Sequence, residues 1–501
     1  MTSSGTQSAG FCACARASLL PELLVALFVL SLAACGDGTG EPPPPPPVAS
    51  ISVVAPATSL ERSLTMKLTA HVRDANGGDL TDRVVAWSTS DKAIAEVNAS
   101  SGLVTGKSPG KVTITATSEG KSAQTRLDIF VLYKSIQLGD LFSCDVGSGV
   151  ASCWGWNGFG VLGNGTQSGS TSTPTDVMGG LAFTQVSTST LHVCGLTTAG
   201  EAYCWGSNST GQGGTGDSRG PSLTPKKVVG GLTFSRISAG DTHTCALTPA
   251  GKAYCWGDND FGQLGVNSDV ESLDTPTAVE GGLTFKNISA GVRATCGVTT
   301  SNQAYCWGSD ESGELGNGGP ISHMTTDISL VPVAVAGGLS FSSVGVGQFY
   351  ACGLTTAGGV YCWGRNDVGR LGDGETTDTS QPRAIASPLT FTQLDTGFTH
   401  ACAVATGGEA YCWGANNAGE LGVADPADLS RVPVLVSGGG TWSEVTAGRN
   451  AGNAHSCGIS ADRKTVRCWG RNDYGQLGNG GTSPSRTDVP VGVVGQSFDL
   501  E

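Results

Sequence analysis

Apolar and polar residues alternate in short runs along most of this chain, and glycine or proline ends nearly every run. A clear example comprises residues 232–240, 245–248, 253–256 and 276–279. A period of two predicts β-strands, and Pro249-Ala250-Gly251, between the second and third runs, predicts a tight turn. No helical period extends over ten or more residues in this region, so we expect an all-β fold.

This four-run pattern recurs with the phrase Cys-Trp-Gly in its third run. The tryptophans of the seven copies are Trp154, Trp205, Trp256, Trp307, Trp363, Trp413 and Trp469, at steps of 51, 51, 51, 56, 50 and 56 residues. A period of about 50 residues with four short strands is typical of propeller blades. The repeats therefore predict a seven-bladed β-propeller over residues 132–501.

The two ends of the repeat array differ from its middle. The first copy begins at Ile136 without a preceding Pro-x-x-Val run, whereas residues 489–500 follow the last copy as a surplus. Full closure of a ring removes exposed sheet edges. We therefore expect the C-terminal strand to complete the first blade, beside Trp154, and to close the ring.

Each copy also carries two cysteines about ten residues apart. Folding the third copy about Ala250 places Cys245 opposite Cys255, and opposed residues at a non-hydrogen-bonded site lie about 4.5 Å apart, within disulfide reach. Buried, reduced thiols are the alternative, and a metal knuckle needs closer spacing. The expected bridges are Cys144–Cys153, Cys194–Cys204, Cys245–Cys255, Cys296–Cys306, Cys352–Cys362, Cys402–Cys412 and Cys457–Cys468.

Residues 1–35 have the features of an export signal. Residues 23–34 are apolar, and this run is too short to span a bilayer. Its end, Leu32-Ala-Ala-Cys35, resembles a bacterial lipobox, which implies lipidation of Cys35; ordinary signal cleavage is the alternative. Gly36 rather than Asp follows, which favours the outer membrane or cell surface over the inner membrane. The only membrane contact expected is through this lipid.

Loss of Cys12 and Cys14 with the signal, and acylation of Cys35, would leave 17 − 3 = 14 cysteines, the number needed for seven bridges. Such bridges persist in oxidising compartments. Residues 36–47 contain six consecutive prolines and are expected to form a stiff tether.

Apolar and polar residues alternate in short runs over residues 48–131, a segment that lacks cysteine. This pattern predicts a small β-sandwich. The segments 85–97 and 102–116 resemble the group 2 bacterial Ig-like domain, which implies a spacer or adhesive unit.

The charge of the whole chain limits the classes of partner: the net charge is −14, and no basic run occurs. Nucleic-acid binding requires clustered Lys and Arg, so we expect no nucleic-acid partner.

The third repeat carries a family resemblance. Residues 238–247, Ser-Ala-Gly-x-x-His-x-Cys-Ala-Leu, and residues 255–265, Cys-Trp-Gly-x-Asn-x-x-Gly-Gln-Leu-Gly, resemble the repeat of the regulator of chromosome condensation. This resemblance implies a seven-bladed propeller. The eukaryotic namesake is a nucleotide exchange factor for a Ran-type GTPase, whereas bacterial relatives are mostly secreted, and one group inhibits β-lactamases.

We therefore expect a lipid-anchored, non-enzymatic propeller that binds a protein or glycan at the cell envelope, with the Ig-like domain as its stalk. The alternatives are exchange-factor-like activity and inhibition of a secreted enzyme. The G-x-S-x-G match at residues 216–220 lacks the strand–turn–helix context of a nucleophile elbow, so we expect no catalytic residues. No cofactor is expected.

Four histidines occupy one repeat position, two residues before the first cysteine: His192, His243, His400 and His455. Phe142, Ala294 and Tyr350 replace histidine in the other copies, which favours packing and hydrogen bonding over a metal site. Insertions in repeat proteins mark loops and often the binding side. The candidate partner loops are residues 450–453, with Asn450 and Asn453, and residues 318–330, with Ile321 and His323.

Overall fold

A computed structural model of the chain describes residues 44–217, 220–424, 427–450 and 454–495. These residues form 37 β-strands and one short 3-10 helix, η1 (Gly158–Gly160), which confirms the all-β class. No helix in these ranges is long and apolar enough to cross a membrane. The expected export signal, Cys35 and most of the tether lie outside the described residues.

The N-terminal β region, residues 48–131, contains nine strands in three small sheets, ordered β1-β4, β2-β9-β8-β5 and β3-β7-β6. Its strands are β1 (Ser50–Val54), β2 (Ser59–Glu61), β3 (Thr65–Lys67), β4 (Thr69–Arg73), β5 (Ala86–Thr89), β6 (Ala95–Val97), β7 (Leu103–Gly106), β8 (Gly110–Ser118) and β9 (Lys121–Phe130). One apolar cluster that includes Trp87, Val104 and Ile114 fills this region.

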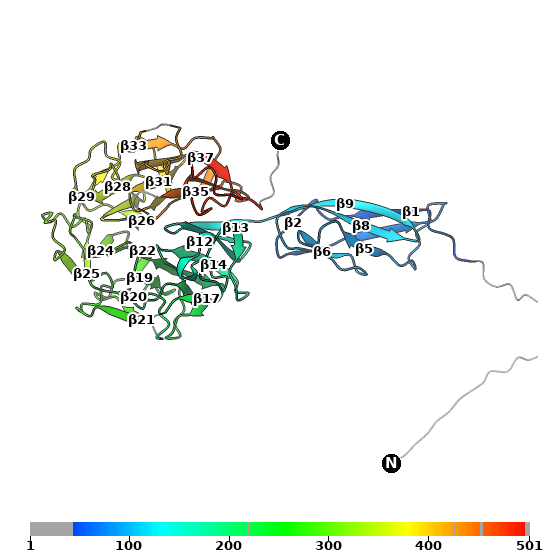
Figure 1. Cartoon of the computed structure of the whole chain (residues 1–501), viewed down its shortest axis with the longest axis horizontal. Coiled ribbons are helices and arrows are strands. Elements are labelled where there is room, and N and C mark those ends of the chain that lie inside the picture. Colours follow the sequence, from blue (N-terminus) through cyan, green and yellow to red (C-terminus); the bar gives the residue numbers. More distant parts are fainter. Residues whose placement is uncertain (1–43, 218–219, 425–426, 451–453, 496–501) are drawn as a thin grey trace, which may run out of the picture. The chain divides into compact units, whose positions relative to one another are not determined.

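From residue 133 onward, the described strands form seven four-stranded antiparallel sheets, which we call blades 1 to 7 (Figure 1). Blade 1 is β10 (Tyr133–Leu138), β11 (Phe142–Gly147), β12 (Val150–Trp156) and β13 (Ser170–Asp176). Blade 2 is β14 (Phe183–Thr188), β15 (His192–Thr197), β16 (Ala202–Gly206) and β17 (Ser222–Lys227). Blade 3 is β18 (Arg236–Ala239), β19 (His243–Leu247), β20 (Ala253–Asp258) and β21 (Ser272–Ala278).

The remaining blades repeat this order. Blade 4 is β22 (Phe285–Ala290), β23 (Ala294–Thr299), β24 (Ala304–Ser309) and β25 (Ile328–Ala334). Blade 5 is β26 (Phe341–Val346), β27 (Tyr350–Thr355), β28 (Val360–Gly364) and β29 (Thr379–Ala384). Blade 6 is β30 (Phe391–Thr396), β31 (His400–Ala405), β32 (Ala410–Ala415) and β33 (Leu429–Leu435). Blade 7 is β34 (Trp442–Ala447), β35 (His455–Ser460), β36 (Val466–Arg471) and β37 (Arg486–Gly492).

The first strands of successive blades contact one another, and β34 contacts β10, so the array closes into a ring. The predicted closure by a C-terminal strand is wrong. β37 pairs with β36, in the sheet that holds Trp469, and blade 1 obtains its fourth strand from β13. The reason is where each repeat begins and ends along the chain. Each proline-containing strand follows the Cys-Trp-Gly strand with which it pairs, so the first blade already has its own fourth strand.

The repeated phrase Cys-Trp-Gly-x-Asn-x-x-Gly-Gln-Leu-Gly builds the junctions between blades. In blade 3, Asn259 Oδ1 accepts a hydrogen bond from the Leu264 amide at 3.1 Å and thereby shapes the loop. Gly265 has a φ of +68° and lies against Trp307 of the next blade, where an added Cβ would come within 2.7 Å of the indole nitrogen. Trp307 Nε1 in turn donates to the Gln263 carbonyl at 3.0 Å. The motif therefore locks each blade to its successor.

The same contacts close the ring between blade 7 and blade 1. Trp154 Nε1 donates to the Gln476 carbonyl at 2.9 Å, and Gly478 lies against the Trp154 indole. Val493 shares an apolar cluster with Trp154, and the Gly480 amide donates to the Ser172 carbonyl at 3.0 Å. Closure thus depends on side-chain packing and hydrogen bonds rather than on strand exchange.

The fourth strand of each blade contains a proline: Pro174, Pro225, Pro276, Pro332, Pro382, Pro433 and Pro490. In blade 5, the Thr379 hydroxyl also bonds to the backbone of Gln381, donating to its carbonyl at 3.0 Å and accepting from its amide at 3.1 Å. Proline has no N–H to donate, and an edge with occupied backbone groups is a poor template for a further strand. These outer strands are therefore poor sites for a partner to add a strand to a blade.

Candidate partner-binding surface

The structure joins the fourteen repeat cysteines in seven disulfides within the described residues. Each bridge links the second and third strands of one blade, with Cα atoms 4.0–4.1 Å apart, and none links two blades. The register expected for the third repeat is observed, with Leu247 opposite Ala253 and Cys245 opposite Cys255. These sulfurs are buried and hold hairpins together, so they form no reactive site.

The four histidines at the shared repeat position are fully buried. Each Nε2 lies 2.8–2.9 Å from a hydroxyl oxygen of the following blade, so the rings belong to separate junctions. The described residues contain no group of three or more His, Cys, Asp or Glu side chains that could hold a metal ion. Ser218, within the G-x-S-x-G match, lies outside the described residues.

The loop of residues 318–330 forms one wall of a groove of about 390 Å³ against β29 of blade 5. The groove is lined by Ile321, Asp378, Thr379, Ser380, Gln381, Pro382 and Arg383. The Gly318 amide donates to the Ser380 carbonyl at 2.8 Å, which fixes the start of the loop beside β29. Ile321, a residue singled out from the sequence, thus contributes an apolar side chain to a groove whose other lining residues, apart from Pro382, are polar.

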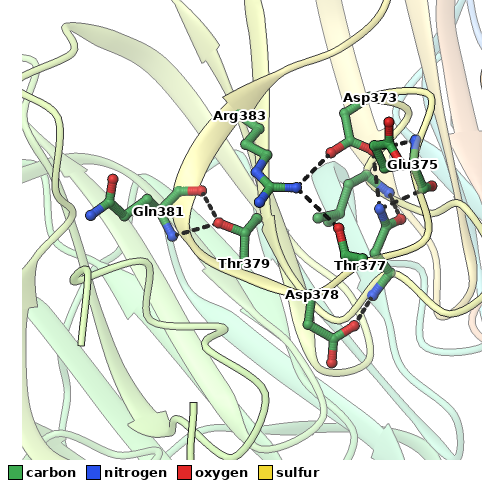
Figure 2. Close-up of polar contacts among 9 residues, drawn as sticks. Asp373, Glu375, Thr377, Asp378, Thr379, Gln381 and Arg383 are labelled. Carbon is green, nitrogen blue, oxygen red and sulfur yellow. Dashed lines mark hydrogen bonds and ion pairs between the residues drawn. The ribbon is translucent and has the colours of Figure 1, made fainter. Parts of the chain in front are cut away.

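Polar contacts hold the blade 5 side of this groove (Figure 2). The Arg383 guanidinium donates to Asp373 at 3.4 Å and to the Thr377 hydroxyl at 3.3 Å. Asp378 accepts from the Asn366 amide at 2.8 Å, the contact that Figure 2 shows at the bottom of the loop. The Arg383 side chain is 43% exposed, so its remaining donors face solvent, whereas the Asp373 carboxylate that it contacts is buried.

The inserted loop is ordered by its own hydrogen bonds. Ser322 Oγ donates to Asp327 at 3.0 Å, and the Asp327 amide donates to the Met324 carbonyl at 3.0 Å. His323 adopts a positive φ of 54°, and its amide donates to the Glu311 carbonyl at 3.0 Å. This turn leaves the Met324 side chain 60% exposed. A single exposed apolar side chain is common on protein surfaces, so its significance depends on the apolar side chains next to it.

The segments around this loop are rich in acidic residues. Residues 253–285 contain six acidic residues and no Lys or Arg. Residues 294–364 contain four acidic residues and no Lys or Arg; Asp310 and Glu314 are buried, whereas Glu311 and Asp327 are partly exposed. The Asn267 amide of the blade 3 loop donates to the Leu330 carbonyl at 3.0 Å, so the two acidic segments meet. Val270 and Ile328, which are 37% and 39% exposed, add apolar area here. The surface combines apolar side chains with negative charge.

The second candidate loop lies elsewhere. Asn450 follows Arg449 on the turn between β34 and β35 of blade 7, and Asn453 lies outside the described residues. Arg449 reaches from blade 7 to blade 4, where its guanidinium donates to the Ala290 carbonyl at 3.1 Å. The structure therefore places Asn450 on an inner turn, separate from the outer groove that Ile321 lines.

One cluster was missed by sequence reasoning. The Arg293 guanidinium stacks on Phe261 at 4.2 Å and on Phe349 at 5.5 Å from the ring centroids. Phe349 has a φ of +61°, a conformation that bulky residues rarely adopt. The three residues come from three different blades, so no local motif pointed to them. Sequence comparison between repeats shows only that each position varies.

A closed ring of repeated four-stranded blades, joined through Trp and Gly of a common motif, defines a β-propeller built from homologous repeats. The RCC1-like domain matches residues 83–398, and the regulator of chromosome condensation (RCC1) repeat matches residues 391–420, 450–476, 407–458 and 465–498. The chain belongs to the RCC1-like domain family.

Two relatives illustrate the sequence similarity. The chain is 32% identical over 236 residues to the ultraviolet-B receptor UVR8 of Arabidopsis thaliana, which covers 46% of this chain and 52% of UVR8. It is 34% identical over 199 residues to the human E3 ubiquitin-protein ligase HERC2, which covers 38% of this chain and 4% of HERC2. The chain thus spans about half the length of UVR8 and a small part of HERC2.

Solved structures agree in fold. Prp20p of Saccharomyces cerevisiae, described with its binding properties to Gsp1p and histones, is 20% identical with a TM-score of 0.60, over 72% of this chain and 87% of Prp20p. Human WBSCR16 is 21% identical with a TM-score of 0.57, over 74% of this chain and 97% of WBSCR16. At this identity the likeness concerns the fold alone.

Proposed function

We propose that the chain is an exported, lipid-anchored propeller that binds a protein partner at the cell envelope. Cys35 would carry the lipid, residues 36–47 would form the tether, and the N-terminal β region would serve as an Ig-like stalk. The seven cystines support export because disulfides persist in oxidising compartments. Binding to Gsp1p and histones, described for Prp20p, supports a protein-binding role.

The observation that carries the binding site is the insertion in blade 4. It adds Ile321 to the groove beside β29 and exposes Met324. Because the surrounding segments are acidic, the partner would present basic side chains next to an apolar one. A protein segment with this composition fits better than a glycan, since the groove is small and its rim is charged rather than aromatic.

Paired substitutions test this site. Ile321→Ser with Met324→Ser removes the apolar side chains of the loop, whereas Leu389→Ser removes an apolar side chain that is 39% exposed on the turn before β30. The purified full-length proteins are cross-linked in envelope extracts, and captured proteins are identified by mass spectrometry. We expect the double variant to retain less than a tenth of a partner that wild type and Leu389→Ser capture equally. Equal capture by all three proteins would exclude this surface.

The lipid anchor has a separate test. Cells that express the wild-type chain or the Cys35→Ser variant are labelled with a radioactive fatty acid, and the membrane and soluble fractions are separated. We expect label and membrane association in the wild type and neither in the variant. A wild-type chain without label, or label that survives Cys35→Ser, would contradict the assignment.

A further inference from the structure

The four buried histidines connect blades through a common arrangement. In each case the imidazole Nε2 lies beside the hydroxyl of a Ser or Thr in the following blade. That Ser or Thr comes one residue after the position that corresponds to the histidine. The pairs are His192–Thr244 at 2.9 Å, His243–Thr295 at 2.8 Å, His400–Ser456 at 2.9 Å and His455–Ser143 at 2.8 Å. We call each pair a latch. The last latch joins blade 7 to blade 1.

The hydroxyl geometry fixes which atom donates. The Ser143 hydroxyl donates its single proton to the Gln476 carbonyl at 2.8 Å. It must therefore accept a hydrogen bond from His455, which places the ring proton on Nε2. Equivalent hydroxyl–carbonyl bonds occur in the other three latches: Thr244 with Gln212, Thr295 with Gln263 and Ser456 with Glu420. All four rings thus use neutral imidazole with the proton on Nε2.

The remaining ring nitrogen has little to bond with. Nδ1 of His243, His400 and His455 has no hydrogen-bond partner among the described residues, and only His192 finds a hydroxyl, that of Ser189 at 2.7 Å. A second proton on His243, His400 or His455 would therefore create a buried N–H without an acceptor, together with a buried charge. Burial accordingly lowers the pKa of all four rings to about 3.

The repeat pattern shows that histidine and hydroxyl occur together. Where a blade lacks the histidine, the following blade also lacks the hydroxyl: the pairs are Phe142–Val193, Ala294–Ala351 and Tyr350–Ala401. The His455–Ser143 pair satisfies the same rule across the two ends of the array. Three junctions are therefore built without a latch, and they provide internal controls for the other four.

The charged groups near the rings do not favour protonation. Arg449 acts on His192 and His243, His243 acts on His192, and His400 acts on His455, and each of these influences lowers a pKa. Asp241 lies on the turn before β19, and Asp140 on the equivalent turn of blade 1. Burial raises the pKa of Asp140 to about 7, so this carboxyl is mostly neutral below that pH.

Carboxyls also occur on the inner strands next to the latches. Burial raises the pKa of Asp395 on β30 and that of Glu444 on β34, the latter to about 8. These groups gain protons as the pH falls and provide no new negative charge to stabilise an imidazolium. Glu444 lies at the same junction as His455, because its Oε1 accepts the Ile136 amide of blade 1 at 3.4 Å. A closed form that holds the Glu444 proton more tightly than an open form is favoured as the pH falls, so this carboxyl opposes the latch.

We propose that the histidine latches are acid-sensitive closures, and that the latch between blade 7 and blade 1 weakens this junction as the pH falls, against the opposite effect of Glu444. This junction carries a latch and is the only one that the chain does not bridge covalently, because its blades lie at opposite ends of the array. The disulfides keep each blade intact while the junction opens, since every one lies within a single blade.

The size of the effect follows from proton linkage. An imidazole that titrates near 6.5 when exposed and near 3 when buried shifts the opening equilibrium by about 25-fold between pH 7 and pH 5. Stability is lost as pH falls, because the open form binds the proton that the closed form excludes. A junction without a latch experiences no such shift.

Amide hydrogen exchange of the full-length protein tests this proposal. The Gly480 amide donates to Ser172 across the junction between blades 7 and 1, and the Gly165 amide donates to Leu223 across the latch-free junction between blades 1 and 2. Wild type and the variant His455→Phe with Ser143→Val, which copies the natural Phe142–Val193 pair, share every carboxyl, so their comparison isolates the latch. After correction for intrinsic exchange, we expect the loss of Gly480 protection between pH 7 and pH 5, relative to that of Gly165, to be about 25-fold larger in wild type than in this variant. Equal losses in the two proteins would overturn the proposal.

Introducing a latch gives a second test. Phe142→His with Val193→Thr should make the loss of Gly165 protection between pH 7 and pH 5 larger than in wild type. An unchanged loss at Gly165 would contradict the mechanism. If one double variant fails to fold, the other keeps the proposal testable against wild type.

Discussion

The N-terminal β region and the ring are stabilised in different ways. The region of residues 48–131 has no cysteine, and its nine basic and eight acidic residues give a net charge of +1. Residues 132–501 contain 18 basic and 31 acidic residues, a net charge of −13, and fourteen cysteines. One apolar cluster fills the first region, whereas the ring divides its apolar residues among several clusters along the array.

Chain connectivity explains the difference. In the N-terminal β region, β2 pairs with β9 and β5 pairs with β8, so strands far apart in sequence share one core. In the ring, every strand pairs only within its own blade. Each blade is therefore too small to depend on its apolar residues alone. Covalent bridges within blades and polar side-chain bonds between blades supply the additional stability.

Reduction should separate the two regions most clearly. Each bridge closes a loop of about ten residues, worth about 2–3 kcal/mol in the chain-entropy model, so loss of all seven should greatly destabilise the ring. The N-terminal β region contains no cysteine and should keep its stability. Hydrogen exchange with and without a phosphine reductant, under mild denaturant, measures both. Equal loss of protection in the two regions would contradict this comparison.

Tryptophan truncation should give the next largest effect. Trp154→Ala removes a fully buried indole from the blade 7–blade 1 junction, and Trp87→Ala removes one that is 7% exposed from the N-terminal core. Each should cost about 3–5 kcal/mol. Exchange protection should fall in blades 1 and 7 for the first variant and only within residues 48–131 for the second. Loss across the entire chain in both proteins would mean that the regions unfold together.

The smallest predicted effect concerns the pH dependence of a buried carboxyl. Burial raises the pKa of Glu444 from 4.5 to about 8, so the folded ring holds its proton more tightly than the unfolded chain. Stability should therefore fall as pH rises from 4.5 through 8. Glu444→Gln removes this dependence and should be about 2 kcal/mol more stable than wild type at pH 6, with the difference vanishing near pH 4.5.

Denaturant titrations at several pH values measure the Glu444 effect. The Ile136 amide, which donates to Glu444 Oε1 at 3.4 Å, retains an acceptor in the glutamine variant. Glu409→Gln, at an exposed position before β32, is the matched control and should follow the wild-type profile. A Glu444→Gln profile parallel to that of wild type would show that this carboxyl does not titrate between the two states.

Repetition made most of the fold predictable. Seven copies of one phrase average out local ambiguity, so the strands, the hairpin at Ala250 and the opposition of Cys245 and Cys255 follow from the pattern. The pattern did not show at which residue each structural repeat begins. A period is the same wherever counting begins, so the surplus at residues 489–500 appeared to belong to the first blade, whereas residues 489–492 belong to the last.

The candidate surface was predictable only in part. The insertion at residues 318–330 is visible as extra length, but its groove with β29 depends on how blade 4 meets blade 5. The same holds for Arg293 between Phe261 and Phe349. The latches left a clearer trace, because the presence of histidine in one copy matches a hydroxyl in the next. Comparing each copy with its successor, rather than with a consensus, would have revealed them.

Closure without strand exchange also bears on how such a molecule can grow. Each blade is finished within its own stretch of about fifty residues, so duplication of one whole unit in the gene would insert a complete sheet and leave every existing strand pair intact. The added blade would need only a tryptophan that packs against the loop of the preceding blade and a loop glycine that packs against the tryptophan of the following blade. Lengthening by whole modules is therefore an accessible evolutionary step for this architecture.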